Sequence, residues 1–239
     1  MKNIQKDITI AIDGFSATGK STVAKRLAKT LKYVYVDTGA MYRAVTYFAL
    51  ENDFIGKDFF HKDALILKLS SINLLFKFNV ELGFSEIYLN DKNIEEPIRS
   101  VRVSSFVSDV AAVPEVRKFL VAMQRKMGKN KAIVMDGRDI GSVVFPNAEL
   151  KIFLTADAKI RAERRLLEMQ EKGIKATLEE ILTNVEKRDR IDSTRDDSPL
   201  VQVEDAVLID VSYITKEEQF HLVYSYAVDA ISEMNMKSD

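Results

Sequence analysis

The sequence predicts an α/β fold built on a mostly parallel sheet. Short apolar runs of the length of a buried strand recur along the chain, and helical patterns separate them. One connection, between Asp37 and Ala132, is much longer than a crossover helix needs, which predicts an insertion there. The chain has 239 residues with 46% hydrophobic and 30% charged residues, as expected for one or two globular domains.

Five continuous, β-favouring runs are predicted as strands of the sheet. Each is too short for a helix of ordinary length and is apolar on both faces, as strands buried in a parallel sheet are. The runs cover residues 8–13, 33–37, 132–136, 150–154 and 206–210.

Between these runs, apolar residues at spacings of three and four predict amphipathic helices. After Lys20, the residues Val23, Leu27 and Leu31 recur at intervals of four. Three further stripes follow: Val116, Leu120, Met123 and Met127; Leu178, Ile181, Leu182 and Val185; and Phe220, Val223, Ala227 and Ile231. Strands that alternate with helices in this way favour a parallel sheet.

The long connection contains a different pattern. Every second residue from Ile72 to Val80 is apolar, which predicts a half-buried antiparallel strand. Residues 90–92, Asn-Asp-Lys, form a turn signal between the short segments 87–89 and 93–94. We therefore expect a small antiparallel β unit within this connection. A long irregular loop is the alternative.

A phosphate-binding loop is predicted at residues 14–21, GFSATGKS, which match G-x-x-x-x-G-K-[ST] at every fixed position. A predicted strand precedes the loop and a predicted helix follows it. The glycines let backbone N–H groups point at an anion, Lys20 reaches the β- and γ-phosphates, and the Ser21 hydroxyl can ligate Mg²⁺. A helix start without a ligand is the alternative. The predicted ATP-binding residues are Gly14, Phe15, Ser16, Ala17, Thr18, Gly19, Lys20, Ser21 and Thr22.

Polar residues also follow the second and third predicted strands, where an α/β sheet places its ligands. Asp37 begins a DTGAMYR segment, in which this carboxylate can hold a magnesium-bound water and Arg43 can face a second anion. Simple capping of the next helix by Asp37 is the alternative. In Asp136-Gly137-Arg138-Asp139, the guanidinium can grip a phosphate and Asp139 can accept from a hydroxyl or amino group. An internal Arg–Asp surface pair is the alternative.

A charged segment, residues 188–195 (RDRIDSTR), lies at a predicted helix end, and Arg161, Arg164 and Arg165 begin the preceding helix. Arginines in a mobile segment over a phosphate loop suit phosphoryl transfer, because they neutralise charge on the transferring group while water is excluded. A solvated helix face is the alternative.

Composition excludes several classes of function. The chain has 0 Cys and 2 His, so disulfides, cysteine nucleophiles and thiolate metal sites are impossible, and a multi-histidine metal site is not expected. The 35 basic and 36 acidic residues give a net charge of −1, which offers no whole-chain attraction to nucleic acid or to an anionic membrane. No apolar run reaches the roughly 18 residues of a membrane span, and no signal peptide is recognisable. We expect a cytoplasmic monomer.

These motifs resemble one family, the bacterial cytidylate kinases of the nucleoside-monophosphate kinase group. The resemblance runs from Ile8 to about Tyr226. Its most specific pieces are Asp13 with the phosphate loop, residues 37–43 (DTGAMYR), 136–141 (DGRDIG) with 144–146 (VFP), 151–156 (KIFLTA) with Arg161, Arg164 and Arg165, and 188–190 (RDR) with Asp192 and Arg195. The phosphate loop departs from many relatives at Phe15, Ala17 and Thr18, where they carry proline and small glycine-rich residues.

The resemblance implies a three-layer P-loop kinase fold with a five-stranded parallel sheet and an inserted small antiparallel β unit. It implies a core of residues 1–64 with 102–239, an inserted monophosphate-binding β unit at 65–101 and a short lid at 186–199. The implied reaction transfers the γ-phosphate of ATP to CMP or dCMP with Mg²⁺. Small molecules, rather than nucleic acid or membranes, are the implied partners.

The resemblance also assigns residues to roles. The implied pyrimidine-nucleotide site consists of Thr38, Ser108, Arg117, Arg138, Asp139 and Asp192. Within it, Ser108, Arg138 and Asp139 read the cytosine region and Asp192 meets the sugar. Arg43, Arg188 and Arg195 bind phosphates. Together with the motifs above, the expected catalytic set is Lys20, Arg161, Arg165, Arg188 and Arg195, and the expected metal residues are Ser21 and Asp37.

Two other functions stay open on the residues alone. The first is a kinase for UMP, another monophosphate or a small hydroxyl acceptor. Asp139 is the residue that separates a cytosine kinase from a uracil kinase, because a carboxylate can accept a hydrogen bond from the cytosine amino group, whereas uracil has a carbonyl at that position. The second is an ATP-dependent binding switch without an acceptor. The paired arginine sets and the insertion favour a second small-molecule site over such a switch.

Overall fold

A computed structural model describes residues 7–81, 84–171 and 173–236. Residues 1–6, 82–83, 172 and 237–239, which belong to the expected core and insertion, lie outside the described residues. The chain divides into two compact units: a first unit of Met1–Tyr35 with Gly128–Asp239, and a second unit of Val36–Met127. The roles expected for 65–101 and 186–199 concern binding, and these assignments stay predictions.

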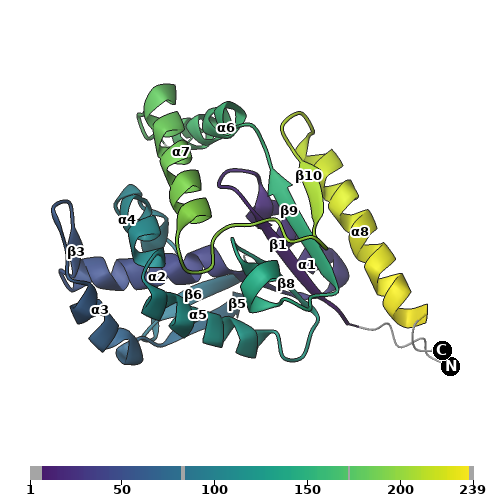
Figure 1. The fold of residues 1–239 in the computed structure, drawn as a ribbon, viewed down its shortest axis with the longest axis horizontal. Coiled ribbons are helices and arrows are strands. Elements are labelled where there is room, and N and C mark those ends of the chain that lie inside the picture. The colour runs from purple at the N-terminus through teal and green to yellow at the C-terminus, as the bar shows by residue number, and fades with distance from the viewer. Residues whose placement is uncertain (1–6, 82–83, 172, 237–239) are drawn as a thin grey trace. The chain divides into compact units, whose positions relative to one another are not determined.

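The first unit is built on a five-stranded sheet with the order β10-β9-β1-β8-β2. Figure 1 labels β10, β9, β1 and β8 of this sheet. Its central strand, β1, pairs in parallel with β8 and β9, and β9 pairs in parallel with β10. Strand β1 lies in the middle of the sheet, and each of its residues is buried. The phosphate loop follows directly after the carboxyl end of this strand. The strands are β1 Thr9–Gly14, β2 Val34–Asp37, β8 Ile133–Asp136, β9 Leu150–Thr155 and β10 Val207–Asp210. All five predicted strands are confirmed to within one residue.

Among the described residues, the α-helices of the first unit are α1 Lys20–Leu31, α6 Ala158–Glu171, α7 Leu178–Thr194 and α8 Lys216–Met236. Helices α1 and α8 contact each other, and their predicted apolar stripes are buried in one cluster with β1 and β9. Helices α6 and α7 pair through a smaller cluster that contains Ala162, Ile181 and Val185. A short π-helix, η3 Ile140–Val144, follows β8 and contacts β1.

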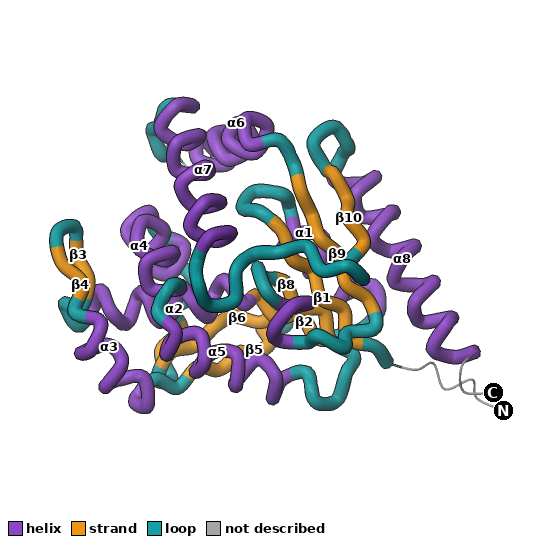
Figure 2. Tube along the Cα trace, in the orientation of Figure 1, coloured by secondary structure: helices purple, strands orange, loops and turns teal. Residues whose placement is uncertain are grey.

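The segment expected to form a lid is mostly regular helix. Helix α7 continues to Thr194 and then passes into an irregular loop that leads to β10 (Figure 2). A reciprocal capping box begins the helix, in which the Thr177 hydroxyl accepts from the Glu180 N–H and the Glu180 carboxylate accepts from the Thr177 N–H. Helix α7 therefore presents its charged residues from a defined backbone.

The second unit contains helices and a small antiparallel sheet. Helix α2 contacts α4, α5 and β6, and α4 contacts α5. The elements of the second unit are α2 Thr38–Glu51, β3 Ile55–Gly56, β4 Phe59–Phe60, α3 Lys62–Lys68, η1 Leu69–Ser71, β5 Leu74–Asn79, β6 Phe84–Leu89, β7 Lys92–Asn93, η2 Pro97–Arg99, α4 Val101–Ala111 and α5 Pro114–Met127. The hairpin of β3 and β4 was not predicted, because strands of two residues carry no periodicity.

The predicted antiparallel unit is confirmed, with the order β5-β6-β7. The predicted burial of the alternating stripe is only half right. Ile72 and Leu74 are buried, whereas Phe78 is 65% and Val80 is 84% exposed. The register explains this difference, because Leu74 pairs with buried Leu89 whereas Phe78 pairs with Ser85.

The part of the chain that the structure describes contains no helix with both the length and the apolar character of a membrane span.

Candidate active site

The phosphate loop joins the end of β1 to the start of α1, and its conformation explains its glycines. Gly14 has φ 141°, and a Cβ atom there would lie 2.0 Å from the Leu154 carbonyl oxygen. Gly19 caps α1 in the left-handed region at φ 80°. The predicted loop residues therefore form one turn between a buried strand and a helix N-terminus, a geometry that binds anions.

Lys20 lies across this loop and is 5% exposed. Its ammonium donates to the Phe15 carbonyl and contacts Thr18 Oγ1 at 3.5 Å. Burial lowers the pKa of Lys20 well below its usual value, and the nearby Arg138 guanidinium lowers it further. A bound polyphosphate would supply negative charge that favours the protonated side chain.

Gln219 of α8 contacts the backbone of the phosphate loop, and the sequence reasoning missed this residue. The side chain is 6% exposed, and its Nε2 donates to the Thr18 carbonyl at 3.1 Å. Gln219 Oε1 lies 3.1 Å from the position of a Cβ atom built on Gly19. The only signal in the sequence is a polar residue beside the apolar stripe of α8.

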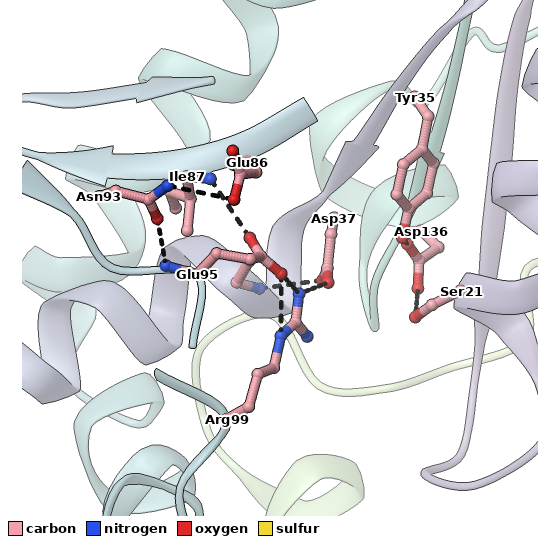
Figure 3. A network of polar contacts seen from close by, with 10 residues as sticks. Ser21, Tyr35, Asp37, Glu86, Ile87, Asn93, Glu95, Arg99 and Asp136 are labelled. Atoms are coloured by element: carbon pink, nitrogen blue, oxygen red, sulfur yellow. Dashed lines mark hydrogen bonds and ion pairs between the residues drawn. The ribbon is translucent and has the colours of Figure 1, made fainter. Parts of the chain in front are cut away.

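Ser21 donates a 2.8 Å hydrogen bond from its hydroxyl to Asp136 Oδ2, and Tyr35 donates to Asp136 Oδ1 at 2.8 Å (Figure 3). Asp136 ends β8, next to β1 in the sheet, and is 4% exposed. A hydroxyl and a carboxylate at this place form the oxygen-donor pair with which phosphate-loop proteins hold Mg²⁺. The residues present therefore fit a magnesium ion, although Asp136 was not predicted as a metal residue.

Asp37 makes other contacts, all within the second unit. Its Oδ1 accepts from the Ala40 N–H at 2.9 Å and its Oδ2 from Arg99 at 2.9 Å, while Arg99 also pairs with Glu95 at 2.8 Å (Figure 3). The capping alternative is therefore confirmed. These contacts do not include Ser21, and the metal role predicted for Asp37 stays a prediction. No group of three or more possible metal-ligating His, Cys, Asp or Glu residues occurs within the described residues.

Asp192 joins the two predicted arginine-rich segments. Arg138 Nε donates to Asp192 Oδ2 at 2.8 Å, and Arg195 lies 3.5 Å from Oδ1. Burial raises the pKa of Asp192, but Arg138, Arg188 and Arg195 outweigh burial and hold that pKa below its ordinary value. The structure thus brings Arg138, Asp192 and Arg195 together as one ionised cluster.

Arg188 has the least satisfied charge in this cluster. Its Nε is buried and has no hydrogen-bond partner in the structure. Burial lowers the pKa of Arg188 to about 10, and Arg138 and Arg165 repel its charge further. A guanidinium with a buried, free donor and cationic neighbours is a candidate for anion binding.

The three arginines of α6 contact different partners. Arg161, 4% exposed, donates from Nε to the Ala156 carbonyl at 2.8 Å and pairs with Asp189 Oδ2 at 2.6 Å. Arg164 donates to the Val211 carbonyl at 2.7 Å. The side chain of Arg165 is 38% exposed and pairs with Glu168. The contacts of Arg161 and Arg164 hold neighbouring loops, and the predicted catalytic roles of Arg161 and Arg165 stay predictions.

Asp13 is another residue that sequence reasoning did not place in the site. Its carboxylate accepts from the Ile140 N–H at 2.8 Å and the Gly141 N–H at 2.7 Å. Burial raises the pKa of Asp13 to about 7, and the negative charge of Asp139 also raises it. Asp13 thereby fixes the turn that follows Arg138 and the 3%-exposed Asp139.

The remaining predicted substrate residues lie on three helices of the second unit that contact each other. Thr38 begins α2, and Arg43 of α2 donates to Ser104 Oγ of α4 at 2.7 Å. Ser108 lies one turn after Ser104 on α4. Arg117 of α5 is 1% exposed and donates to the Ala111 carbonyl at 3.3 Å. Ser104 is a further polar group that the sequence reasoning missed.

Comparison with known proteins decides the family. The model of the family described as "Cytidylate kinase" matches residues 10–228. The chain belongs to the cytidylate kinase family. A cytidylate kinase of Flavobacterium johnsoniae is 63% identical over 226 residues, which cover 95% of this chain and 98% of the relative. The cytidylate kinase of Flavobacterium psychrophilum is 58% identical over 218 residues, 91% and 96% of the two chains.

A third cytidylate kinase, from Parabacteroides distasonis, is 52% identical over 214 residues, which cover 90% of this chain and 93% of the relative. The family resemblance predicted from the motifs is therefore confirmed. The match spans both units, so the second unit is part of the family's common chain rather than an addition to this member.

Proposed function

We propose that this protein transfers the γ-phosphate of ATP to CMP or dCMP, giving ADP with CDP or dCDP. The observation that carries the proposal is a phosphate loop with buried Lys20, in a chain matched by the cytidylate kinase family over residues 10–228. The unpartnered Arg188 Nε in the same unit supplies a second cationic group for phosphoryl transfer.

The reaction needs positioning and charge more than covalent chemistry. A phosphate oxygen of CMP attacks the γ-phosphorus of ATP in line, and the bond to the β-phosphate oxygen breaks to release ADP. No strong base is needed, because the attacking oxygen is already ionised at neutral pH. The loop N–H groups and Lys20 hold the donor phosphates, and Arg188 stabilises charge on the transferring group.

Ser21 and Asp136 are the residues that would hold Mg²⁺. When bound, the ion neutralises charge on the donor phosphates. Tyr35 supports this arrangement, because its hydroxyl donates to the second oxygen of Asp136 and orients the carboxylate.

Specificity for cytosine is proposed to come from Arg138 and Asp139, together with Ser108. Asp139 can accept from the exocyclic amino group of cytosine, whereas uracil offers a carbonyl oxygen there. Asp192 would meet the sugar, Arg43 and Arg195 would bind phosphates, and Thr38 and Arg117 would complete the nucleotide site. The burial of Asp139 supports this role, since a buried carboxylate discriminates strongly between a donor and an acceptor.

The functional division expected from the sequence is also part of the proposal. Residues 65–101 would serve monophosphate binding and residues 186–199 would act as the lid. Support for the lid comes from α7, which carries Arg188 and Asp192, with Arg195 directly after it.

The test of the proposed function is ADP release from Mg·ATP with CMP, dCMP, UMP, AMP, GMP, shikimate or no acceptor. High turnover with CMP and dCMP and low turnover with UMP is the expected result. Turnover with another acceptor would leave the phosphate loop intact and overturn the base assignment. ATP binding without acceptor-dependent release would favour a binding switch.

Variants of two cations test the mechanism. Lys20→Ala or Arg188→Ala should lower kcat by about 100-fold or more, because each removes charge that stabilises the transferring group. The KM for CMP should change much less. Matched controls are Lys29→Ala and Arg190→Ala, which remove exposed cations from the same two helices and should keep normal turnover. Normal turnover in both Lys20→Ala and Arg188→Ala would exclude the mechanism.

A further inference from the structure

We infer that Phe15 is a positioning residue, whose ring holds Arg161 and through it the arginine-bearing end of α7 against the phosphate loop. The inference rests on the proposed phosphoryl transfer and adds to it a role for a loop side chain. The phosphate loop binds its ligand through backbone N–H groups, so the loop motif itself assigns nothing to the bulky side chain at this position.

The Phe15 ring is fixed between the sheet and a cation. It meets Phe153 of β9 edge-to-face, with ring centroids 5.9 Å apart and planes at 89°. The guanidinium carbon of Arg161 lies 5.2 Å from the Phe15 centroid. The Phe15 N–H also donates to the Leu154 carbonyl at 3.3 Å. Phe15 is therefore anchored to β9 on one side and presents its ring to Arg161.

Arg161 extends this contact to α7. One terminal nitrogen, NH2, lies 2.6 Å from Asp189 Oδ2, and the other, NH1, donates to the Ser16 carbonyl of the loop at 3.4 Å. Because Arg161 is 4% exposed, its interaction with the ring is little weakened by water. The same guanidinium thus contacts the Phe15 ring, the loop backbone and a carboxylate of α7.

Asp189 directly precedes Arg190 and follows Arg188, the residue with the unpartnered buried Nε. A shift of Asp189 therefore moves Arg188 with it, since both belong to the same turn of α7. A displacement of about 1 Å in a group that contacts the transition state is enough to slow a reaction strongly. Loosening Arg161 at the Phe15 ring should accordingly impair the transferring step more than the binding of either nucleotide.

The experiment compares Phe15→Leu with Phe15→Tyr in the full-length protein. Leucine keeps apolar volume against Phe153 but removes the ring face, whereas tyrosine retains the ring. With ATP and CMP, Phe15→Leu should lower kcat about fivefold and leave both KM values within about twofold of wild type. Phe15→Tyr should recover most of the lost turnover.

A matched control separates positioning from general destabilisation. Phe220→Leu removes another ring–arginine contact of the first unit, in which the Arg26 guanidinium lies 3.7 Å from the Phe220 centroid. Thermal unfolding of all variants identifies an assay temperature at which each is folded. Phe220→Leu should lower the unfolding midpoint and keep wild-type kcat.

The double variant Phe15→Leu with Asp189→Asn tests the contact chain itself. Because both changes break the same connection, the double variant should have a kcat within about twofold of the slower single variant. Multiplied effects would overturn the inference, as would a Phe15→Leu enzyme with wild-type kcat. A wild-type protein without CMP-dependent ADP release would instead overturn the proposed function.

Discussion

At the scale of single residues, two carboxylates that follow neighbouring strands of the sheet have different partners. Asp136 accepts from the Ser21 hydroxyl, whereas Asp37 caps α2 and pairs with Arg99. Both are acidic residues at strand ends, and the sequence pattern does not distinguish them. The contacts favour Asp136 as the magnesium residue, which leads to a direct comparison.

Asp136→Asn should raise the Mg²⁺ concentration for half-maximal turnover about tenfold, because it removes a negatively charged oxygen ligand. Asp37→Asn should leave that concentration unchanged and lower the free energy of unfolding by about 1 kcal/mol, through loss of the Arg99 ion pair. The measurements are magnesium titrations of ADP release and urea unfolding. The opposite assignment of the two effects would restore Asp37 as the metal residue.

Asp13 predicts a pH dependence of stability. Its folded-state pKa of about 7 lies above the ordinary value of 3.8, so the folded state binds more protons between these two values. The folding stability that Asp13 contributes is fully present below about pH 4 and is lost as the pH rises through the folded-state pKa of about 7. The free energy of unfolding lost in this way is up to about 4 kcal/mol.

Urea unfolding at pH 5 and pH 8 measures this contribution. The wild type should lose more unfolding free energy between these values than Asp13→Asn, which has no titrating group there. Only the difference between the two proteins reports on Asp13, since other groups titrate in both. Equal losses would show that Asp13 is ionised throughout this range.

At the scale of elements, continuous apolar runs were predicted well, although the edge strands β2 and β10 are only partly buried. The five sheet strands are continuous apolar runs, and each was found within one residue of its prediction. Strand β5 was predicted with its correct pairing type but with too much burial. Alternation shows which residues share a face, whereas the register with β6 decides how much of that face meets apolar partners.

The turn between β6 and β7 allows a stabilising substitution. Asn90 and Asp91 both have positive φ, 46° and 65°, as a two-residue type I′ hairpin requires. Asn90 Oδ1 also accepts from the Asn73 N–H, so Asn90 should be kept. Asp91→Gly should raise the free energy of unfolding by about 0.5 kcal/mol, because glycine has no Cβ strain in this region.

Asp91→Ala is the control, since alanine at positive φ should lower the free energy of unfolding by about 1 kcal/mol. Chemical denaturation of the wild type, Asp91→Gly and Asp91→Ala measures the three free energies of unfolding. If Asp91→Gly were less stable than the wild type, the Asp91 side chain would contribute more than its backbone strain costs.

At the scale of the whole molecule, the family and the α/β class followed from short contiguous motifs. The phosphate loop, the DTGAMYR segment and the DGRDIG segment each occupy fewer than ten residues, so no tertiary information is needed to recognise them. The predicted residue roles rest on the family resemblance and stay proposals. Cytoplasmic location, a monomeric state and the absence of nucleic-acid and membrane partners likewise stay predictions from composition and pattern.

The sequence by itself determined the five strands of the main sheet, the helices α1, α5, α7 and α8, the insertion and the phosphate loop, because these depend on local spacing and on backbone preferences of nearby residues. Only the tertiary structure decided that Ser21 meets Asp136, 115 residues away, and that Gln219 supports the loop from 201 residues away. Such contacts arise when parallel strands and packed helices bring distant segments together. Spacing along the chain does not indicate these pairings, because each joins residues of elements that are far apart in the sequence.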